Sequence, residues 1–382
     1  NLIRNIPGLF GAAQTDGFVY NANGLTTAIN YGNGLNNYKT YDNRAQLTKN
    51  VYGISETHSN RKETSYSYSS AGNIQSVVDG FSSRTLAYNY DGVNRLITAD
   101  IPATAGVSEQ TFTYDNAGNR VTDIQGQYLY TKYDLDTSPS YNNYTWGSYQ
   151  QLESKTNRLN SILTKYEYTS DRLLGSIKEG GITKATYMYD ALGRRIKTVE
   201  GNTTTITLYA GNDIVYEVKK EGTNPEIKTR YLVLAGKYLA KMVGDEPNLR
   251  TYYYHTDHLG SIRAVSNSNG NIVGLYTYDP FGNVIQEVSY PDADRLRFTG
   301  KRLDSTGLYY FNARYYDSTL GRFILADPAR QGLNWYVYCN NNPLMFVDPD
   351  GCWSRDYRDY KKVVLDSKIV RTEYRFMSQK VK

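Results

Sequence analysis

The chain has 382 residues, with 43 Lys and Arg against 38 Asp and Glu, which gives a formal net charge of +5. The segment 353–382 holds nine of the basic and four of the acidic residues, so residues 1–352 hold 34 of each and are neutral, which argues against nucleic-acid binding by the body of the protein. No apolar run approaches the roughly 18 residues of a membrane-spanning helix, and two cysteines cannot make a disulfide framework.

Tyrosine is the most unusual feature of the composition, with 39 Tyr against 10 Phe, and 32 Gly accompany it. Tyrosine favours strands and can bury its ring while its hydroxyl stays hydrogen-bonded. Glycine and asparagine supply the positive-φ positions of tight turns. The composition therefore predicts an all-β protein with many short strands and many turns.

One sequence unit recurs along the chain, consisting of a tyrosine-rich strand, Tyr-Asp, a turn with Gly or Asn, and a second strand. Clear copies are YKTYDNRAQL, AYNYDGVNRLITAD, FTYDNAGNRVTDI, YMYDALGRRIKTV and YTYDPFGNVIQEV, and weaker copies are FVYNANGLTTAI, YSYSSAGNIQSVV and YEYTSDRLLGSI. The last tyrosine before each turn is Tyr20, Tyr41, Tyr68, Tyr90, Tyr114, Tyr168, Tyr189 or Tyr278, with Tyr133 in a further degenerate copy.

Each unit is predicted to be a β-hairpin. The YxY alternation places both rings on one face of the sheet, and the aspartate at the turn can accept a backbone hydrogen bond. A single hairpin is not stable alone, so neighbouring units should stack into a continuous ribbon. Two loops, residues 135–160 and 221–228, are expected to interrupt the regular succession of hairpins.

The C-terminal third contains several candidate sites that have plain structural explanations. His255 and His258 flank Asp257, but only the distant His58 could join them, so a turn without metal is favoured over a zinc site. The ring-rich block 307–317 is expected to be a packed plug rather than a stacking platform for bases or sugars.

The remaining chemistry-bearing residues give few signals. The two cysteines, Cys339 and Cys352, are predicted to be free thiols, and no CxxC pair, P-loop, Rossmann fingerprint or Ser-His-Asp order is present. No cofactor is therefore expected. Asp327-Pro328 and Asp348-Pro349 are, from their residues alone, ordinary turn openers.

The repeated units resemble the YD repeats of the rearrangement hotspot (RHS) family. The blocks YYYHTDHLGSIRAV, YTYDPFGNVI, RFTGKRLDSTGLYYFNARYYDSTLGRFILADP and NWYVYCNNNPLMFVDPDG resemble, in order, the RHS repeat-associated core domain. This superfamily includes the C components of toxin complexes, polymorphic toxins, wall-associated proteins and teneurins.

The resemblance implies an all-β fold in which a spiralling ribbon of YD-repeat hairpins forms part of a hollow shell, closed by an inward-winding core-domain plug. It implies three parts: a shell segment at 1–249, a core domain at 250–352, and a short basic tail at 353–382 that is the start or remnant of an effector. We expect the chain to be the C-terminal part of a larger, exported protein, secreted or on the cell surface, that continues upstream of Asn1.

The resemblance also implies a function, in which the shell encapsulates and delivers a C-terminal toxin and the core domain cuts itself just after the second DPxG. The required arginine and two aspartates correspond to Arg314, Asp327 and Asp348, and the cut falls near Gly351, Cys352 and Trp353. Two carboxyls held close cannot both ionise, so one can act as acid while the other activates water. No turnover of external substrates is expected.

This sequence departs from the family pattern near the first aspartate. The family usually has DPxGLxGGxN there, whereas this chain has DPARQGLN, which is two residues shorter, and Cys352 replaces the usual Leu after DPxG. The implied partners are the chain's own tail as cargo and other toxin-complex or secretion components. An alternative hypothesis is a cell-surface or wall-associated YD-repeat adhesin that binds glycans or a partner protein without catalysis.

Overall fold

The computed structural model describes residues 17–57, 59, 61–100, 109–123, 125–131, 134–139, 142–234, 236–330 and 332–358. These residues form short strands and two 3-10 turns, η1 (Phe298–Gly300) and η2 (Cys339–Asn341). The prediction of an all-β protein is confirmed. Within the described ranges, no helix has the length and apolar character needed to cross a membrane.

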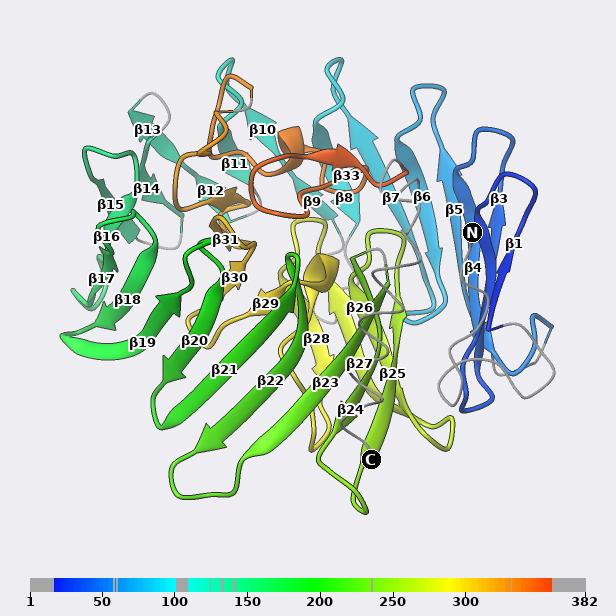
Figure 1. The fold of residues 1–382 in the computed structure, drawn as a ribbon. Coiled ribbons are helices and arrows are strands. Elements are labelled where there is room, and N and C mark those ends of the chain that lie inside the picture. Colours follow the sequence, from blue (N-terminus) through cyan, green and yellow to red (C-terminus); the bar gives the residue numbers. More distant parts are fainter. Residues whose placement is uncertain are drawn as a thin grey trace.

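The strands β1–β28 form a ribbon of three consecutive sheets, and within each sheet every strand pairs antiparallel with the next one along the chain (Figure 1). A nine-stranded sheet comprises β1 (Phe18–Tyr20), β2 (Thr26–Asn30), β3 (Asn36–Tyr41), β4 (Leu47–Gly53), β5 (Lys62–Tyr68), β6 (Ile74–Asp79), β7 (Arg84–Tyr90), β8 (Leu96–Asp100) and β9 (Glu109–Thr111). A three-stranded sheet follows, with β10 (Thr113–Tyr114), β11 (Arg120–Asp123) and β12 (Gly126–Gln127).

The ribbon continues in a sixteen-stranded sheet. Its strands are β13 (Leu129–Thr131), β14 (Asp134–Ser138), β15 (Asn142–Trp146), β16 (Leu152–Asn157), β17 (Leu163–Tyr168), β18 (Leu174–Glu179), β19 (Ile182–Tyr189), β20 (Arg195–Glu200), β21 (Thr203–Ala210), β22 (Asp213–Glu221), β23 (Ile227–Leu234), β24 (Lys237–Val243), β25 (Arg250–Thr256), β26 (Ile262–Asn267), β27 (Ile272–Tyr278) and β28 (Val284–Val288). Two small sheets complete the fold: β29 (Arg302–Leu303), β30 (Leu308–Tyr310), β31 (Tyr315–Asp317) and β32 (Arg322–Phe323), and then β33 (Phe346–Val347) with β34 (Arg355–Asp356).

The Tyr-Asp turns have one recurring geometry, which explains the repeated sequence. The aspartate Oδ1 accepts the backbone N–H groups two and four residues later, and the residue three positions later has a positive φ. Complete examples begin at Asp42, Asp91, Asp190 and Asp279. A side-chain acceptor that holds two amides closes the turn locally, so each hairpin carries its own turn signal.

The tyrosine before the turn joins each hairpin to the preceding one. A register shift in the strand pair precedes this residue, and its hydroxyl donates to the carbonyl of the first residue of the strand after the preceding turn, over 2.7–2.9 Å. The donors are Tyr41, Tyr68, Tyr90, Tyr114, Tyr168, Tyr189, Tyr209 and Tyr278. The bond spans two hairpins, so it fixes the curvature of the ribbon as well as its pairing.

The ribbon curls through a complete circuit and returns to its own start. Tyr31 donates its hydroxyl to the carbonyl of Tyr254, 223 positions later, over 3.1 Å. Phe18 and Ile29 share a buried cluster with Leu239 and other residues of β24 and β25. In Figure 1, β25 accordingly lies beside the first hairpins.

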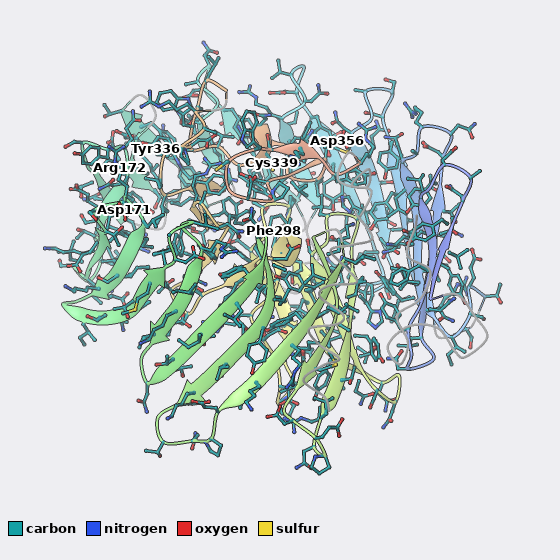
Figure 2. The ribbon with its side chains drawn as sticks, viewed as in Figure 1. Asp171, Arg172, Phe298, Tyr336, Cys339 and Asp356 are labelled. Carbon is teal, nitrogen blue, oxygen red and sulfur yellow. The ribbon has the colours of Figure 1, made fainter. Side chains whose placement is uncertain are left out.

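The plug, which we define as residues 289–352, fills the space that the ribbon encloses. Figure 2 shows Phe298 and Cys339 at the centre of the molecule, and both are 2% exposed. The expected plug at 307–317 is confirmed: the tyrosines of β30 and β31 are buried whichever face of the strand they occupy. Aromatic side chains of the plug belong to three of the four buried clusters, together with buried side chains of the ribbon.

One of the two predicted loops consists mostly of strands. The expected loop at 135–160 is wrong, because most of it forms β14, β15 and β16, with Leu135, Tyr144 and Leu152 buried. Asn, Thr, Ser and Lys side chains on the other face gave this stretch its loop-like composition. The second break is the turn between β22 and β23, as expected, while Tyr133 lies outside the described residues.

The division of the chain into domains stays a prediction. The boundary between residues 249 and 250 falls between β24 and β25, which pair with each other, so the ribbon runs across it. The core domain as predicted therefore contains the last four strands of the ribbon as well as the plug up to residue 352.

The tyrosine contact makes a stability prediction. Tyr90→Phe should lower the free energy of unfolding by about 1 kcal/mol, because the buried Ile74 carbonyl loses its donor. Tyr149→Phe is the control, since Tyr149 is 59% exposed, and should change stability by less than about 0.5 kcal/mol. Urea unfolding of both variants measures the difference, and equal effects would contradict the structural role assigned to the hydroxyl.

Candidate functional site

Arg314 is the centre of the candidate site, and it lies just before β31 with 4% of its surface exposed. Its guanidinium carbon lies 3.6 Å from the centroid of the Phe323 ring. Its Nε donates to the Gly351 carbonyl, and its Nη1 donates to the Trp335 carbonyl over 2.9 Å. One buried side chain thus connects three segments of the plug.

The third donor of Arg314 faces both predicted aspartates. Nη2 donates to Asp348 Oδ2 over 3.1 Å and lies 4.0 Å from Asp327 Oδ1. Asp327 and Asp348 are 4% and 2% exposed. Because Asp327 Oδ1 and Asp348 Oδ2 both lie within 4.0 Å of Arg314 Nη2, the distance between these two oxygens is at most twice 4.0 Å. The shorter DPARQGLN loop has not moved Asp327 away from the site.

Each aspartate also serves as the turn opener that its sequence suggested. Asp327 Oδ1 accepts the N–H of Ala329 over 2.9 Å. Asp348 Oδ1 accepts three successive backbone N–H groups, from Gly351, Cys352 and Trp353, over 2.8–3.3 Å. The two interpretations of the aspartates are therefore compatible, because the turn is what places the carboxyl beside Arg314.

The surroundings of Asp348 raise the pKa of its carboxyl. Burial raises the pKa of this carboxyl and the nearby Asp350 raises it further, while the Arg314 guanidinium opposes them. A raised carboxyl pKa means that the neutral acid persists to higher pH than in water. Burial, together with the neighbouring carboxylates, also raises the pKa of the Cys352 thiol to about 11, which keeps it protonated at neutral pH.

The predicted cleavage residues lie directly on this cluster. Gly351 has φ of +79° and so close a fit that a Cβ there would lie 2.4 Å from the Phe311 carbonyl oxygen. Cys352 is partly exposed and Trp353 is 50% exposed. A cavity of about 530 Å³ opens beside them, lined by Asp327, Asp350 and Cys352 on the plug and by hairpin turns of the ribbon.

Sequence reasoning missed the role of the asparagines in the plug. Asn334 and Asn341 donate their side-chain N–H groups to the turn at 115–119. Asn342 donates to Asn73 Oδ1 and the Asn94 carbonyl, each over 2.9 Å, in the turns after β5 and β7. The plug thus binds a row of hairpin ends. The Asn-rich run was visible in the sequence, but its partners are more than 200 positions away.

The histidines have structural surroundings. His255 is fully buried, its Nε2 lies 2.8 Å from Ser266 Oγ, and burial lowers its pKa to about 3, so it stays neutral. His258 Nε2 lies 2.9 Å from the Leu344 carbonyl. His58 lies outside the described residues. Among the side chains that the structure describes, no group of three or more His, Cys, Asp or Glu could hold a metal ion.

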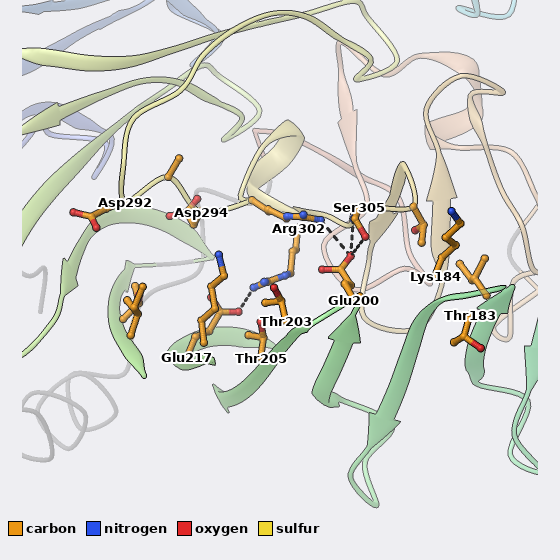
Figure 3. A pocket seen from close by; sticks show the side chains of 18 of the residues that line it. Thr183, Lys184, Glu200, Thr203, Thr205, Glu217, Asp292, Asp294, Arg302 and Ser305 are labelled. Atoms are coloured by element: carbon orange, nitrogen blue, oxygen red, sulfur yellow. Dashed lines mark hydrogen bonds and ion pairs between the residues drawn. The ribbon is translucent and has the colours of Figure 1, made fainter. Parts of the chain in front are cut away.

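A second cavity, of about 710 Å³, lies between the inner face of β16–β24 and the plug (Figure 3). Arg302 from the plug pairs with Glu217 of β22, and Glu200 Oε1 accepts both the N–H and the hydroxyl of Ser305 over 2.6 Å. The charged groups labelled in Figure 3 therefore mostly fasten the plug to the ribbon wall.

A curled ribbon of Tyr-Asp hairpins around a plug of this kind defines a YD-repeat shell. The model of the teneurin YD-shell family matches residues 17–344, and the chain belongs to that family.

Relatives with named activities are similar over much of this chain. The tRNA3(Ser)-specific nuclease WapA of Bacillus spizizenii is 31% identical over 313 residues, which cover 78% of this chain and 11% of WapA. The double-stranded DNA deaminase toxin A of Burkholderia cenocepacia is 28% identical over 325 residues, 75% of this chain and 22% of the toxin. The chain thus spans about a tenth to a fifth of the length of these relatives.

Solved structures share the fold. The crystal structure of TcdB2-TccC3 superposes with a TM-score of 0.67 at 20% identity, covering 89% of this chain and 20% of that chain. The resemblance to RHS and YD-repeat proteins is confirmed, at the level of family and fold.

The tight packing of Gly351 makes a prediction about stability. Gly351→Ala should lower the free energy of unfolding by clearly more than about 1 kcal/mol, because it adds a clash with the Phe311 carbonyl to an unfavourable φ. Gly307→Ala is the matched control, since Gly307 has φ of +83° but open space around it. Urea unfolding separates the two contributions, and equal losses would contradict the close fit.

Proposed function

We propose that this chain is the C-terminal end of a shell that carries a C-terminal toxin, and that its plug cuts the chain between Gly351 and Cys352. The observation that carries the proposal is the position of Arg314, which donates to the Gly351 carbonyl while its Nη2 lies within 4.0 Å of both Asp327 and Asp348. The chain itself occupies the site as substrate.

The reaction is the hydrolysis of one peptide bond. Asp327 accepts a proton from water, and the resulting hydroxide attacks the Gly351 carbonyl carbon. Arg314 Nε–H stabilises the negative charge that develops on the Gly351 oxygen, in the manner of an oxyanion hole. The cavity lined by Asp327 and Cys352 gives the water a path to the bond.

Asp348 completes the step as general acid. Its Oδ1 accepts the Cys352 N–H over 3.1 Å, which places the carboxyl beside the leaving nitrogen, and burial raises the pKa of this carboxyl. Once water has added to the carbonyl and that nitrogen has a free lone pair, the protonated carboxyl can give it a proton as the C–N bond breaks. The products are a carboxyl group on Gly351 and an amine on Cys352. The step leaves Asp327 protonated and Asp348 ionised. The pair returns to its starting state when Asp327 gives a proton to solvent and Asp348 takes one up.

The carrier role draws on the relatives. A nuclease, a DNA deaminase toxin and the toxin subunit YenC2 of Yersinia entomophaga, which is 36% identical over 115 residues, combine a similar region with far longer chains. Their shared region fits a common carrier, while their named activities differ. We propose that the partners here are the chain's own tail as cargo and other toxin-complex or secretion components, with export as the localisation.

The cleavage proposal is tested by two isosteric variants. Asp327→Asn and Asp348→Asn should each slow cleavage by about 10²- to 10⁴-fold, because each removes one proton-transfer group. The N-terminally tagged chain is expressed, and mass spectrometry should find a fragment ending at Gly351 in the wild type. Asp317→Asn in the same plug serves as the control and should cleave normally.

Two results would count against the proposal. Uncleaved wild-type chain, indistinguishable from Asp327→Asn, would remove the protease role, and glycan-array binding by that chain would favour the adhesin hypothesis. A fragment ending at Cys352 would keep the protease but move the cut, and would contradict the role of the Gly351 carbonyl.

The acid role of Asp348 predicts a pH dependence. Its pKa is raised, and the protonated form is the active one, so cleavage should slow as pH rises through that pKa. Uncleaved chain from inclusion bodies is refolded by dilution at a series of pH values, and the cleavage rate is followed on gels. A rate that increases steadily with pH would contradict the assignment of Asp348 as the acid.

A further inference from the structure

We propose that residues 353–358, the docked segment, remain bound to the shell after the cut as a peptide ligand, so that the tail is cut without being set free. The inference rests on the proposed cleavage and names the surface that keeps its product. The surface consists of β33 and the buried cluster in which Tyr357 packs with residues of the plug and of β4–β6.

The backbone of the docked segment is paired with the shell side of the cut. Within β34, Arg355 and Asp356 pair antiparallel with Val347 and Phe346 of β33. The N–H of Tyr357 then donates to the Met345 carbonyl over 3.0 Å. An added strand of this kind is a common way for one chain to hold an extended peptide, because the main-chain hydrogen bonds do not require a covalent link.

The side chain of Tyr357 supplies the anchor. It is 2% exposed and belongs to the same buried cluster as the inward-facing residues of β4–β8. Its hydroxyl lies 2.8 Å from that of Tyr68, one of the tyrosines that join neighbouring hairpins. Its ring packs edge-on against His258, with 5.1 Å between centroids. Tyr357 thus occupies a place in the hydroxyl network of the ribbon.

The turn at Asp348 holds the backbone between the cut and the anchor, and the Trp353 side chain is left exposed. Trp353 is 50% exposed, and its N–H donates to Asp348 and Asp350 over 3.3 Å. On the other side of the cut, Gly351 is held by Arg314. The scissile bond therefore lies between two anchored points, and breaking it leaves both anchors intact. Asp356, labelled in Figure 2, marks the docked segment beside the plug.

The inference is tested on the full chain with an affinity tag at its N-terminus and an epitope at its C-terminus. After cleavage, the C-terminal fragment should co-elute with the N-terminal fragment under native conditions. Tyr357→Ala should release it at least tenfold faster in a wash series, whereas Leu159→Ala, at a ribbon position that is 73% exposed and outside the docked segment, should retain it as the wild type does. Because cleavage needs a folded site, the cleaved fraction of each variant reports on its folding.

An inserted recognition sequence for a site-specific protease, between Trp353 and Ser354, makes the test independent of self-cleavage. If the chain fails to cut itself but the protease-cut tail is retained and depends on Tyr357, the cleavage proposal fails and the anchor stands. If the wild-type tail washes off as fast as the Tyr357→Ala tail after either cut, the anchor is overturned and the cleavage proposal is untouched.

Discussion

The hydrogen bond from each repeat tyrosine to a carbonyl of the preceding hairpin is the contact on which the rest of the structure depends. Antiparallel pairing alone would leave the relative tilt of neighbouring hairpins loosely set, since two-stranded units are barely stable by themselves. The hydroxyl bond, which recurs along the ribbon, joins the residue just before one turn to the residue just after the preceding turn. Curvature is thereby specified locally, and a complete circuit follows from repetition.

A ribbon that curls inward must cover its tyrosine-lined face. Rings on the inner face leave a large apolar surface, and the plug supplies rings of its own, with Tyr309, Tyr316 and Tyr338 fully buried among them. The polar ends of the hairpins need partners as well, and the plug asparagines provide them. The plug is therefore complementary to both parts of the ribbon, which fixes the position of Arg314 and its two aspartates.

The sequence alone predicted most of the ribbon, because the residues that form each turn are close together in the chain. The spacing of Tyr-Asp-x-x-Gly encodes a turn within five residues, as at Asp190 and Gly193, so counting repeats predicts most hairpins. The sequence prediction missed strands β14–β16, because their residues are mostly polar and their buried positions are few and widely spaced.

The candidate site was predictable only in part, for a different physical reason. Its members were named by resemblance, yet nothing in the spacing of Arg314, Asp327 and Asp348 states that one guanidinium nitrogen faces both carboxyls. That convergence depends on the folded plug, which depends on contacts with hairpins more than 200 positions away. The asparagine contacts and the Tyr357 anchor were missed for the same reason. The sequence around each of these residues gives no indication of the distant residue that it contacts.

A site that cuts its own chain, as we propose for this one, has different requirements from a site that turns over external substrate. A self-cleaving site does not have to bind one substrate molecule after another, so its reacting side chains can be buried, as Arg314 and Asp348 are. What it needs is a scissile bond held still, and here turns and strand pairing provide that: Asp348 fixes the residues after its own turn, and β34 fixes the chain beyond. The contacts that would position the bond for cutting are those that would keep the two products together afterwards. In the proposed reaction, cleavage and release would be separate events, and the binding of the docked segment would govern release.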